Sequence, residues 1–135
     1  MRQMGTMPTA ELLAAARRAR ERAYAPYSEF HVGAAVETEE GVVITGCNVE
    51  NASLGLSICA ERVAMTRAIA EGHRAFRAIA IAGPQGVETP PCGTCRQFMA
   101  EFNGDMDVAF TSVDGTIETT LAKLLPHPFT TQSLP

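Results

Sequence analysis

Three cysteines and one glutamate, set in two short motifs, constrain this chain more than any other feature. Cys59-Ala60-Glu61 is followed later in the chain by Pro91-Cys92-Gly93-Thr94-Cys95. Three thiolates can hold a zinc ion and leave its fourth position open, and catalytic zinc sites keep an open position. A glutamate so close to a ligand can move protons at that position. The sequence therefore predicts a fold in which the two motifs meet, with Cys59, Cys92 and Cys95 as zinc ligands and Glu61 as the acid–base group.

Both motifs lie where helices are expected to begin. Apolar residues recur at helical spacing over Ile58–Glu71, and Cys92–Phe102 is expected to form a second helix. Helix amino ends favour thiolates, but three thiolates around a dication leave a negative centre that opposes ionisation of a bound water. We expect Arg62 to offset part of this charge by donating hydrogen bonds to the sulfurs, the alternative being an ordinary exposed arginine.

Other interpretations of these residues have to be weighed. Cys92 and Cys95 alone would suit a redox pair, but that motif normally follows the first strand of a βαβ unit and leaves Cys59-x-Glu61 unexplained. A closed structural site would need Cys47, whose spacing to Cys59 is unlike that of a zinc knuckle, so we expect Cys47 to be a buried strand residue. Glu61 alone could simply favour the helix dipole. The three histidines show no ligand spacing and are expected to be structural or exposed: His31, His73 and His127.

The rest of the chain alternates helical and strand patterns. Helical spacing from Leu12 to Ala23 should end near Tyr24, because Pro26 disfavours helix at the residue before it. Asn48–Ser57 is polar and is expected to be a loop. Five strands are predicted, followed by a short helix over residues 121–125: Phe30–Val36, Val42–Cys47, Phe76–Ala82, Met106–Thr111 and Thr116–Thr120. This order predicts an α/β fold with three α/β/α layers around a five-stranded mixed sheet, formed by one domain over residues 1–135.

Size and charge restrict the function classes. A chain of 135 residues suits one domain, and a net charge of −4 lacks the basic field needed to grip nucleic acid. The segment from Met1 to Tyr24 has several arginines and does not resemble a signal peptide, and no apolar run is long enough to span a bilayer. The four cysteines suit a reducing cytoplasm, so we expect a cytoplasmic protein with a small-molecule substrate, and neither nucleic acid nor membrane as partner.

Five sequence blocks resemble the cytidine deaminases and occur in the order typical of that family. The cysteine–glutamate pattern is the three-cysteine form of the zinc deaminase signature. The blocks are Tyr24–Ala35, Gly46–Ser53, Cys59–Arg62, Pro91–Gln97 and Leu124–Phe129. The chain resembles the short, homotetrameric members, and the resemblance implies zinc-dependent hydrolysis of cytidine and 2′-deoxycytidine to the uridines and ammonia, a step of pyrimidine salvage.

The same resemblance assigns roles to single residues. It makes Cys59, Cys92 and Cys95 the zinc ligands and Glu61 the proton shuttle. It also implies five substrate-binding residues: Phe30, Asn48, Glu50, Ala60 and Phe129. Asn48 and Glu50 would hold the ribose 3′-hydroxyl, Phe30 would pack against the pyrimidine, and the Ala60 backbone would contact the base edge. Phe129 would reach the site of a neighbouring subunit. The alternative is a capped loop for Asn48 and Glu50, and plain core for Phe30 and Phe129.

The chain departs from the family pattern at two places. Leu54 stands where an aromatic residue is usual, and the tail over residues 130–135 is only loosely similar. Three other functions were weighed against cytidine deamination. A blasticidin S type deaminase shares the zinc blocks, but Asn48–Asn51 favours an ordinary ribose. A zinc-stabilised binding module is the non-enzymatic alternative, and polynucleotide editing is disfavoured by small size and acidic charge.

Overall fold

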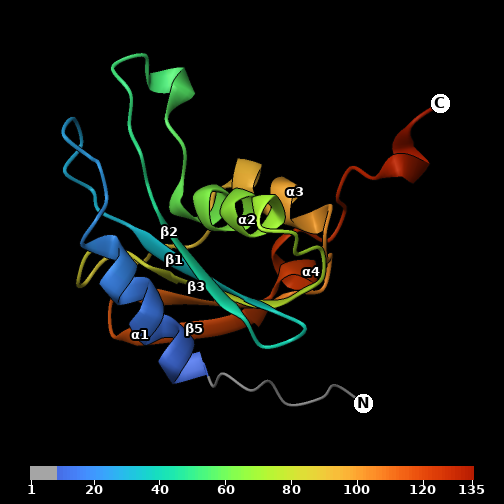
Figure 1. Ribbon diagram of the computed structural model, residues 1–135, viewed down its shortest axis with the longest axis horizontal. Coiled ribbons are helices and arrows are strands. Elements are labelled where there is room, and N and C mark those ends of the chain that lie inside the picture. Colours follow the sequence, from blue (N-terminus) through green and yellow to red (C-terminus); the bar gives the residue numbers. More distant parts are fainter. Residues whose placement is uncertain (1–8) are drawn as a thin grey trace.

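The nine expected helices and strands all occur in the computed structural model, which describes residues 9–135 (Figure 1). They are α1 (Thr9–Arg20), β1 (Gly33–Thr38), β2 (Val43–Cys47), α2 (Ala60–Ala70), β3 (Phe76–Ala82), α3 (Gly93–Ala100), β4 (Asp107–Ser112), β5 (Gly115–Thr120) and α4 (Leu121–Leu124). Two single 3₁₀ turns, η1 (Leu54–Leu56) and η2 (Thr131–Ser133), lie outside them. None of the helices between residues 9 and 135 is both long and apolar enough to cross a membrane.

The five strands form one mixed sheet in the order β2-β1-β3-β4-β5. β3 and β4 are parallel, as the helix that connects them requires, whereas the other three neighbouring pairs are antiparallel. α1 covers one face of the sheet, and α2 and α3 lie side by side on the other (Figure 1). The expected three-layer α/β/α architecture is therefore confirmed.

Each face of the sheet has its own apolar core. Successive strand residues point to opposite faces, so Ile79 and Ile81 pack under α2 and α3 whereas Ala80 and Ala82 pack under α1. The α1 side is lined mainly by alanine, which lets the helix lie close to the sheet. Larger side chains, including Phe76, fill the side that supports the two cysteine helices.

Several element boundaries differ from the sequence expectation, and two of these differences have a clear structural cause. α1 ends at Arg20, because the chain then turns to pair with a later segment: the backbone N–H of Tyr24 donates to the carbonyl of Asn48 at 3.0 Å. The first strand begins at Gly33 and not at Phe30. The Asn48 side chain accepts from the Val32 N–H at 2.9 Å and donates to the Phe30 carbonyl at 2.8 Å, so a side chain binds the backbone groups expected to pair with a strand.

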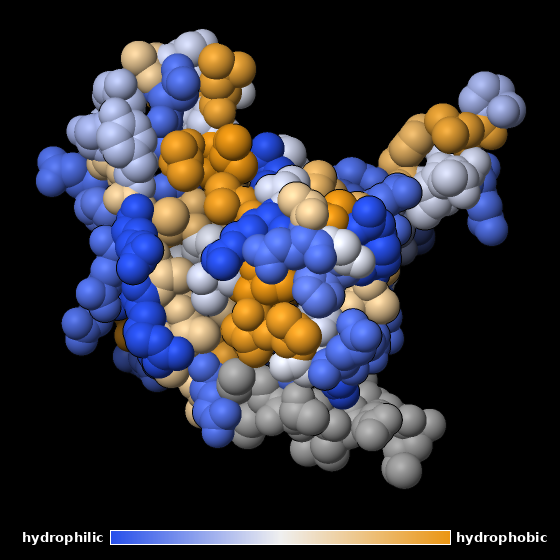
Figure 2. All heavy atoms as spheres, viewed as in Figure 1, coloured by the Kyte–Doolittle hydropathy of each residue, from blue (hydrophilic) through white to orange (hydrophobic). Residues whose placement is uncertain are grey.

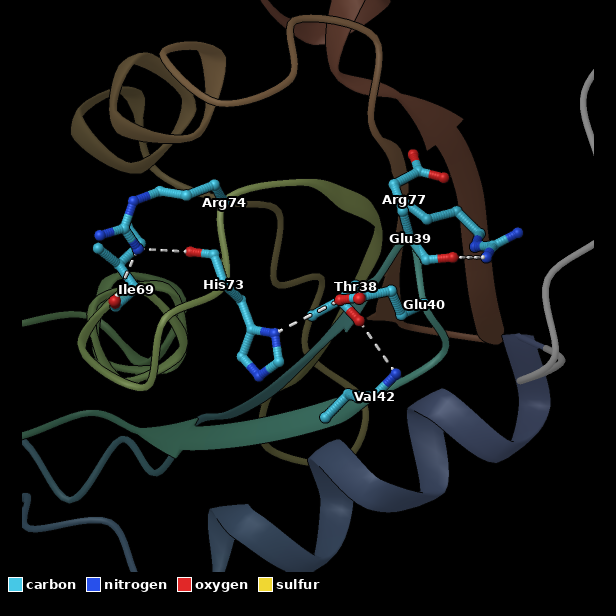
Figure 3. A network of polar contacts seen from close by, with 8 residues as sticks. All are labelled: Thr38, Glu39, Glu40, Val42, Ile69, His73, Arg74 and Arg77. Atoms are coloured by element: carbon cyan, nitrogen blue, oxygen red, sulfur yellow. Dashed lines mark hydrogen bonds and ion pairs between the residues drawn. The ribbon is translucent and has the colours of Figure 1, made fainter.

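Polar contacts fix the edge of the sheet where β3 begins (Figure 3). Arg74 donates to the carbonyls of Ile69 and His73, both at 2.8 Å, and so ties the end of α2 to the turn that follows it. The carboxylate of Glu40, in the β1–β2 hairpin, lies 3.9 Å from His73 Nδ1. This contact agrees with the expectation that His73 is a structural residue and not a metal ligand. These contacts lie at the C-terminal end of α2, and the amino end of the helix, which carries the first cysteine motif, lies at the opposite end of the strands.

Gly46 lets β2 lie directly against the first turns of α2. A Cβ atom at this position would lie 2.4 Å from the Ala64 nitrogen and 2.9 Å from the Ala60 oxygen, both of them backbone atoms. Neither atom can move without shifting the helix that follows Cys59. The absence of a side chain at Gly46 thus sets the distance between the sheet and the helix.

Replacing Gly46 with alanine is expected to destabilise the fold by about 1–3 kcal/mol, because an added methyl group must push two backbone segments apart. Gly104→Ala is the matched control, since a Cβ there meets nothing within 4 Å, and it should change stability by less than about 0.5 kcal/mol. Urea unfolding of the two variants measures the difference. Equal midpoints would show that α2 adjusts freely.

Candidate functional site

The two cysteine motifs meet at the amino ends of α2 and α3. Cys59 is the N-cap residue of α2, Cys92 is the N-cap residue of α3, and Cys95 lies in the first turn of α3. The three sulfur atoms all lie within 4.8 Å of one another, and those of Cys59 and Cys92 are 3.7 Å apart. α2 and α3 run parallel, so both helices begin over the same end of the strands. Residues that are far apart in the sequence therefore form one cluster.

The geometry and chemistry of this cluster fit zinc. Tetrahedral zinc with Zn–S bonds of about 2.3 Å places its sulfur ligands about 3.8 Å apart, close to the distance between Cys59 and Cys92. Within residues 9–135, these three cysteines are the one group of three or more metal-ligating side chains that converge. Cys47 lies outside the group, half-buried at the end of β2, which speaks against a closed four-cysteine site.

The surroundings of the cluster favour a thiolate at Cys59. A hydrogen bond from the Cys95 thiol, aided by Arg62, lowers the pKa of Cys59 to about 5. The same hydrogen bond, together with burial, raises the pKa of Cys95. Arg62 Nη2 lies 3.8 Å from the Cys59 sulfur, the contact expected of it. Its Nε is buried and has no hydrogen-bond partner among the described residues.

Glu61 is buried beside the sulfur atoms, with only 4% of its surface exposed. Burial raises the pKa of this carboxyl to about 7, and the Cys59 thiolate adds to the effect. A carboxyl with a pKa near neutrality can both accept and return a proton under physiological conditions. The first turn of α2 thus places an acid–base group next to a three-sulfur metal site.

Asn48 and Glu50, the expected ribose ligands, hold the loop that precedes β1. Asn48 binds the backbone of Phe30 and Val32, as described above. One carboxylate oxygen of Glu50, Oε1, accepts from the N–H groups of Tyr27 and Ser28 at 3.0 and 3.2 Å, and Oε2 accepts from the Ser28 hydroxyl. Both side chains thus cap a loop in this structure. Each also keeps hydrogen-bonding capacity, because an amide nitrogen has two protons and each oxygen can accept twice.

The two phenylalanines expected at the substrate are not core residues. Phe30 is 39% exposed and Phe129 is 59% exposed. Ala60, between Cys59 and Glu61, is fully buried. The Gln97 side chain holds the Phe129 backbone at two points, donating to its carbonyl at 2.8 Å and accepting from its N–H at 3.0 Å.

Sequence reasoning did not assign these contacts to Gln97 or Ser28. Both residues lie inside the blocks that resemble the family, in Pro91–Gln97 and Tyr24–Ala35. Their position in those blocks was the one sequence feature that could have marked them as functional residues. Their partners, Phe129 and Glu50, are distant in the sequence, so only the fold identifies them.

Comparison with known proteins agrees with this site. The family model described as "Cytidine and deoxycytidylate deaminase zinc-binding region" matches residues 7–112. A cytidine deaminase from Sporosarcina psychrophila is 46% identical over 130 residues, covering 95% of this chain and 96% of the relative. A crystal structure of cytidine deaminase from Burkholderia pseudomallei superposes with a TM-score of 0.87 at 47% identity, covering 91% of this chain and all of that one.

A more distant relative has a different named substrate. A blasticidin-S deaminase from Bacillus cereus is 29% identical over 111 residues, covering 76% of this chain and 79% of the relative. The matched family model spans both cysteine motifs, and the three sulfurs meet as a zinc site requires. The chain therefore belongs to the zinc-binding cytidine and deoxycytidylate deaminase family.

Proposed function

We propose that the protein is a cytidine deaminase that hydrolyses cytidine and 2′-deoxycytidine to uridine and 2′-deoxyuridine with release of ammonia. The observation that supports this most directly is the meeting of three cysteine sulfurs beside the buried carboxyl of Glu61. The names of the relatives give the reaction class, deamination of cytidine, and the description of the matched family adds zinc binding. A role in pyrimidine salvage follows from the products.

Glu61 is the proton carrier in the proposed mechanism. Zinc held by Cys59, Cys92 and Cys95 supplies Lewis-acid activation of the hydrolytic water. Glu61 accepts a proton from that water while the water oxygen bonds to C4 of the pyrimidine. Glu61 then delivers this proton to N3. It then carries the second proton of the water to the amine, which leaves as ammonia when the C4–N bond breaks. One carboxyl acts first as base and then as acid, which its pKa of about 7 suits.

The loop before β1 provides the proposed nucleoside-binding groups. Asn48 and Glu50 hydrogen-bond the ribose 3′-hydroxyl, Phe30 packs against the pyrimidine, and the Ala60 backbone contacts the base edge. The Ser28 hydroxyl lowers the pKa of Glu50, so its carboxylate is ionised and can accept from a sugar hydroxyl. The exposure of Phe30 supports a ligand-facing role, because a core phenylalanine would be buried.

The proposed assembly is a homotetramer in which Phe129 completes a neighbouring site. Large apolar residues are exposed on the loop around η1 and on the C-terminal segment, and Figure 2 shows apolar atoms gathered on both projections. The most exposed residues of these two segments are Leu54 (72%), Leu56 (65%), Phe129 (59%) and Leu134 (57%). Large apolar side chains gathered on exposed surface often mark contacts with a partner, which supports burial of both projections between subunits. Light scattering tests this, and a monomer would remove the role given to Phe129.

The four free cysteines support a cytoplasmic location for the enzyme. Three of them form the metal cluster and need to stay reduced to bind zinc.

The test of the proposed function is a parallel assay of the zinc-loaded protein with cytidine, 2′-deoxycytidine and blasticidin S. We expect loss of cytosine absorbance with the two nucleosides and little turnover of blasticidin S. A preference for blasticidin S would assign the chain to the other named activity among its relatives. Zinc-loaded protein that leaves all three substrates unchanged would point to a binding module.

A further inference from the structure

Ser28 lies between the two groups that we assign to sugar and base. Its hydroxyl donates to Glu50 Oε2, and its oxygen accepts from the Phe30 N–H at 3.0 Å. Its own backbone N–H donates to Glu50 Oε1 at 3.2 Å. One short residue thus contacts both oxygens of the Glu50 carboxylate and the backbone of Phe30.

The backbone between Ser28 and Phe30 has an unusual conformation. Glu29 has φ 58°, and it is the one residue other than glycine with positive φ among residues 9–135. A non-glycine residue in this left-handed region needs support from its surroundings. The hydrogen bond from the Phe30 N–H to the Ser28 oxygen spans Glu29 and closes a local turn of the kind that serine hydroxyls stabilise.

From this geometry we propose that Ser28 is a positioning residue that sets recognition of the substrate's 3′-hydroxyl, by orienting the Glu50 carboxylate and fixing the turn that places Phe30. The inference rests on the proposed function and deepens it. Ser28 itself needs no contact with the substrate.

The contacts explain how a single hydroxyl can act on specificity. The two N–H groups bound to Oε1 hold one side of the carboxylate, and the Ser28 hydroxyl fixes its rotation through Oε2. Among the described residues Oε2 has no other partner, so one accepting position remains for a sugar hydroxyl. Without the Ser28 hydroxyl, the carboxylate can rotate and bind water, and the turn at Glu29 loses its cross-link.

The experiment compares cytidine with 3′-deoxycytidine in wild type, Ser28→Ala and Ser28→Thr. In Ser28→Ala we expect kcat/KM for cytidine to fall about 10-fold or more, mainly through KM, since a hydrogen bond to a charged group is lost. The loss for 3′-deoxycytidine should be several times smaller, because the group that Glu50 recognises is missing. Ser28→Thr keeps the hydroxyl and should restore most of the discrimination.

Ser112→Ala is the matched control. Ser112 also donates its hydroxyl to a glutamate, Glu88, at 3.2 Å, but neither residue belongs to the proposed site. This control should leave the ratio of the two substrates unchanged. Thermal unfolding of each variant checks the fold, and Ser28→Cys, which keeps only a weak donor, takes the place of Ser28→Ala if that variant does not fold.

The possible results distinguish a positioning role of Ser28 from a merely structural one. An equal loss for both substrates in Ser28→Ala would show a merely structural role and overturn the inference, as would no loss with cytidine. Wild-type protein that fails to deaminate cytidine would overturn the proposed function itself, and the inference with it. A substrate-dependent loss restored by threonine supports both.

Discussion

Replacing Glu61 with glutamine should lower kcat by about 10³-fold or more, since positioned proton transfer typically contributes 10²- to 10⁴-fold and the same carboxyl is used more than once. Glutamine has nearly the shape of the carboxyl but cannot accept and return a proton. Burial already disfavours the ionised form of Glu61, so its neutral counterpart should not destabilise the protein. Zinc content should stay at the wild-type level, because Glu61 is not one of the three clustered ligands.

The measurement combines the absorbance assay with elemental analysis and thermal unfolding. Glu71→Gln is the matched control, because Glu71 is the exposed C-cap residue of the same helix and pairs with Arg67 on the surface. It should retain nearly full activity. Substantial activity in Glu61→Gln would reject the proton-shuttle role, and loss of zinc in that variant would show that Glu61 also supports the metal.

Replacing Cys92 with alanine should abolish both zinc binding and turnover. Two remaining thiolates cannot hold the ion in the geometry of three, and metal binding contributes directly to folding free energy. The unfolding temperature should therefore fall to that of the metal-free wild-type protein. Cys92 is the best of the three ligands for this test because its side chain is exposed, whereas Cys95 is buried in the core and its removal would also leave a cavity.

Cys47→Ala provides the control for this experiment. Cys47 is a free, half-buried cysteine outside the cluster, so its replacement should leave one zinc per chain and nearly full activity. Elemental analysis of both variants gives the answer directly. A full zinc content in Cys92→Ala would contradict the ligand assignment, and a loss of zinc in Cys47→Ala would revive the four-cysteine alternative.

The sequence predicted the elements of this fold well because their signals are local. Helical spacing gave α2, and the continuous apolar run at Phe76–Ala82 gave the central strand that helices cover on both faces. Errors occurred where distant segments compete for the same backbone. Phe30–Val32 has a strand-like pattern, but the Asn48 side chain takes the place of a neighbouring strand and hydrogen-bonds the backbone of Phe30 and Val32. No local pattern reports a competitor that lies so far along the chain.

The candidate site divides in the same way. The types and spacing of Cys59, Glu61, Cys92 and Cys95 predicted a zinc site with an acid–base group, since few other chemistries use that set of residues. The contacts of Gln97 with Phe129 and of Ser28 with Glu50 were not predicted. Each joins a residue of one block to a residue of another, and the sequence gives no measure of how blocks meet.

The sequence alone thus predicted the chemistry proposed for this protein, with its zinc ligands and proton carrier, and the layered α/β fold that contains them. The tertiary structure decided the environment in which those groups act. Packing of α2 and α3 on one face of the sheet places three sulfurs within 4.8 Å of one another and leaves Glu61 only 4% exposed. The pKa of Glu61 is raised because that burial removes water from around its carboxyl. Burial depends on contacts between segments that are distant in the sequence, so it follows from the tertiary structure and not from any local sequence pattern.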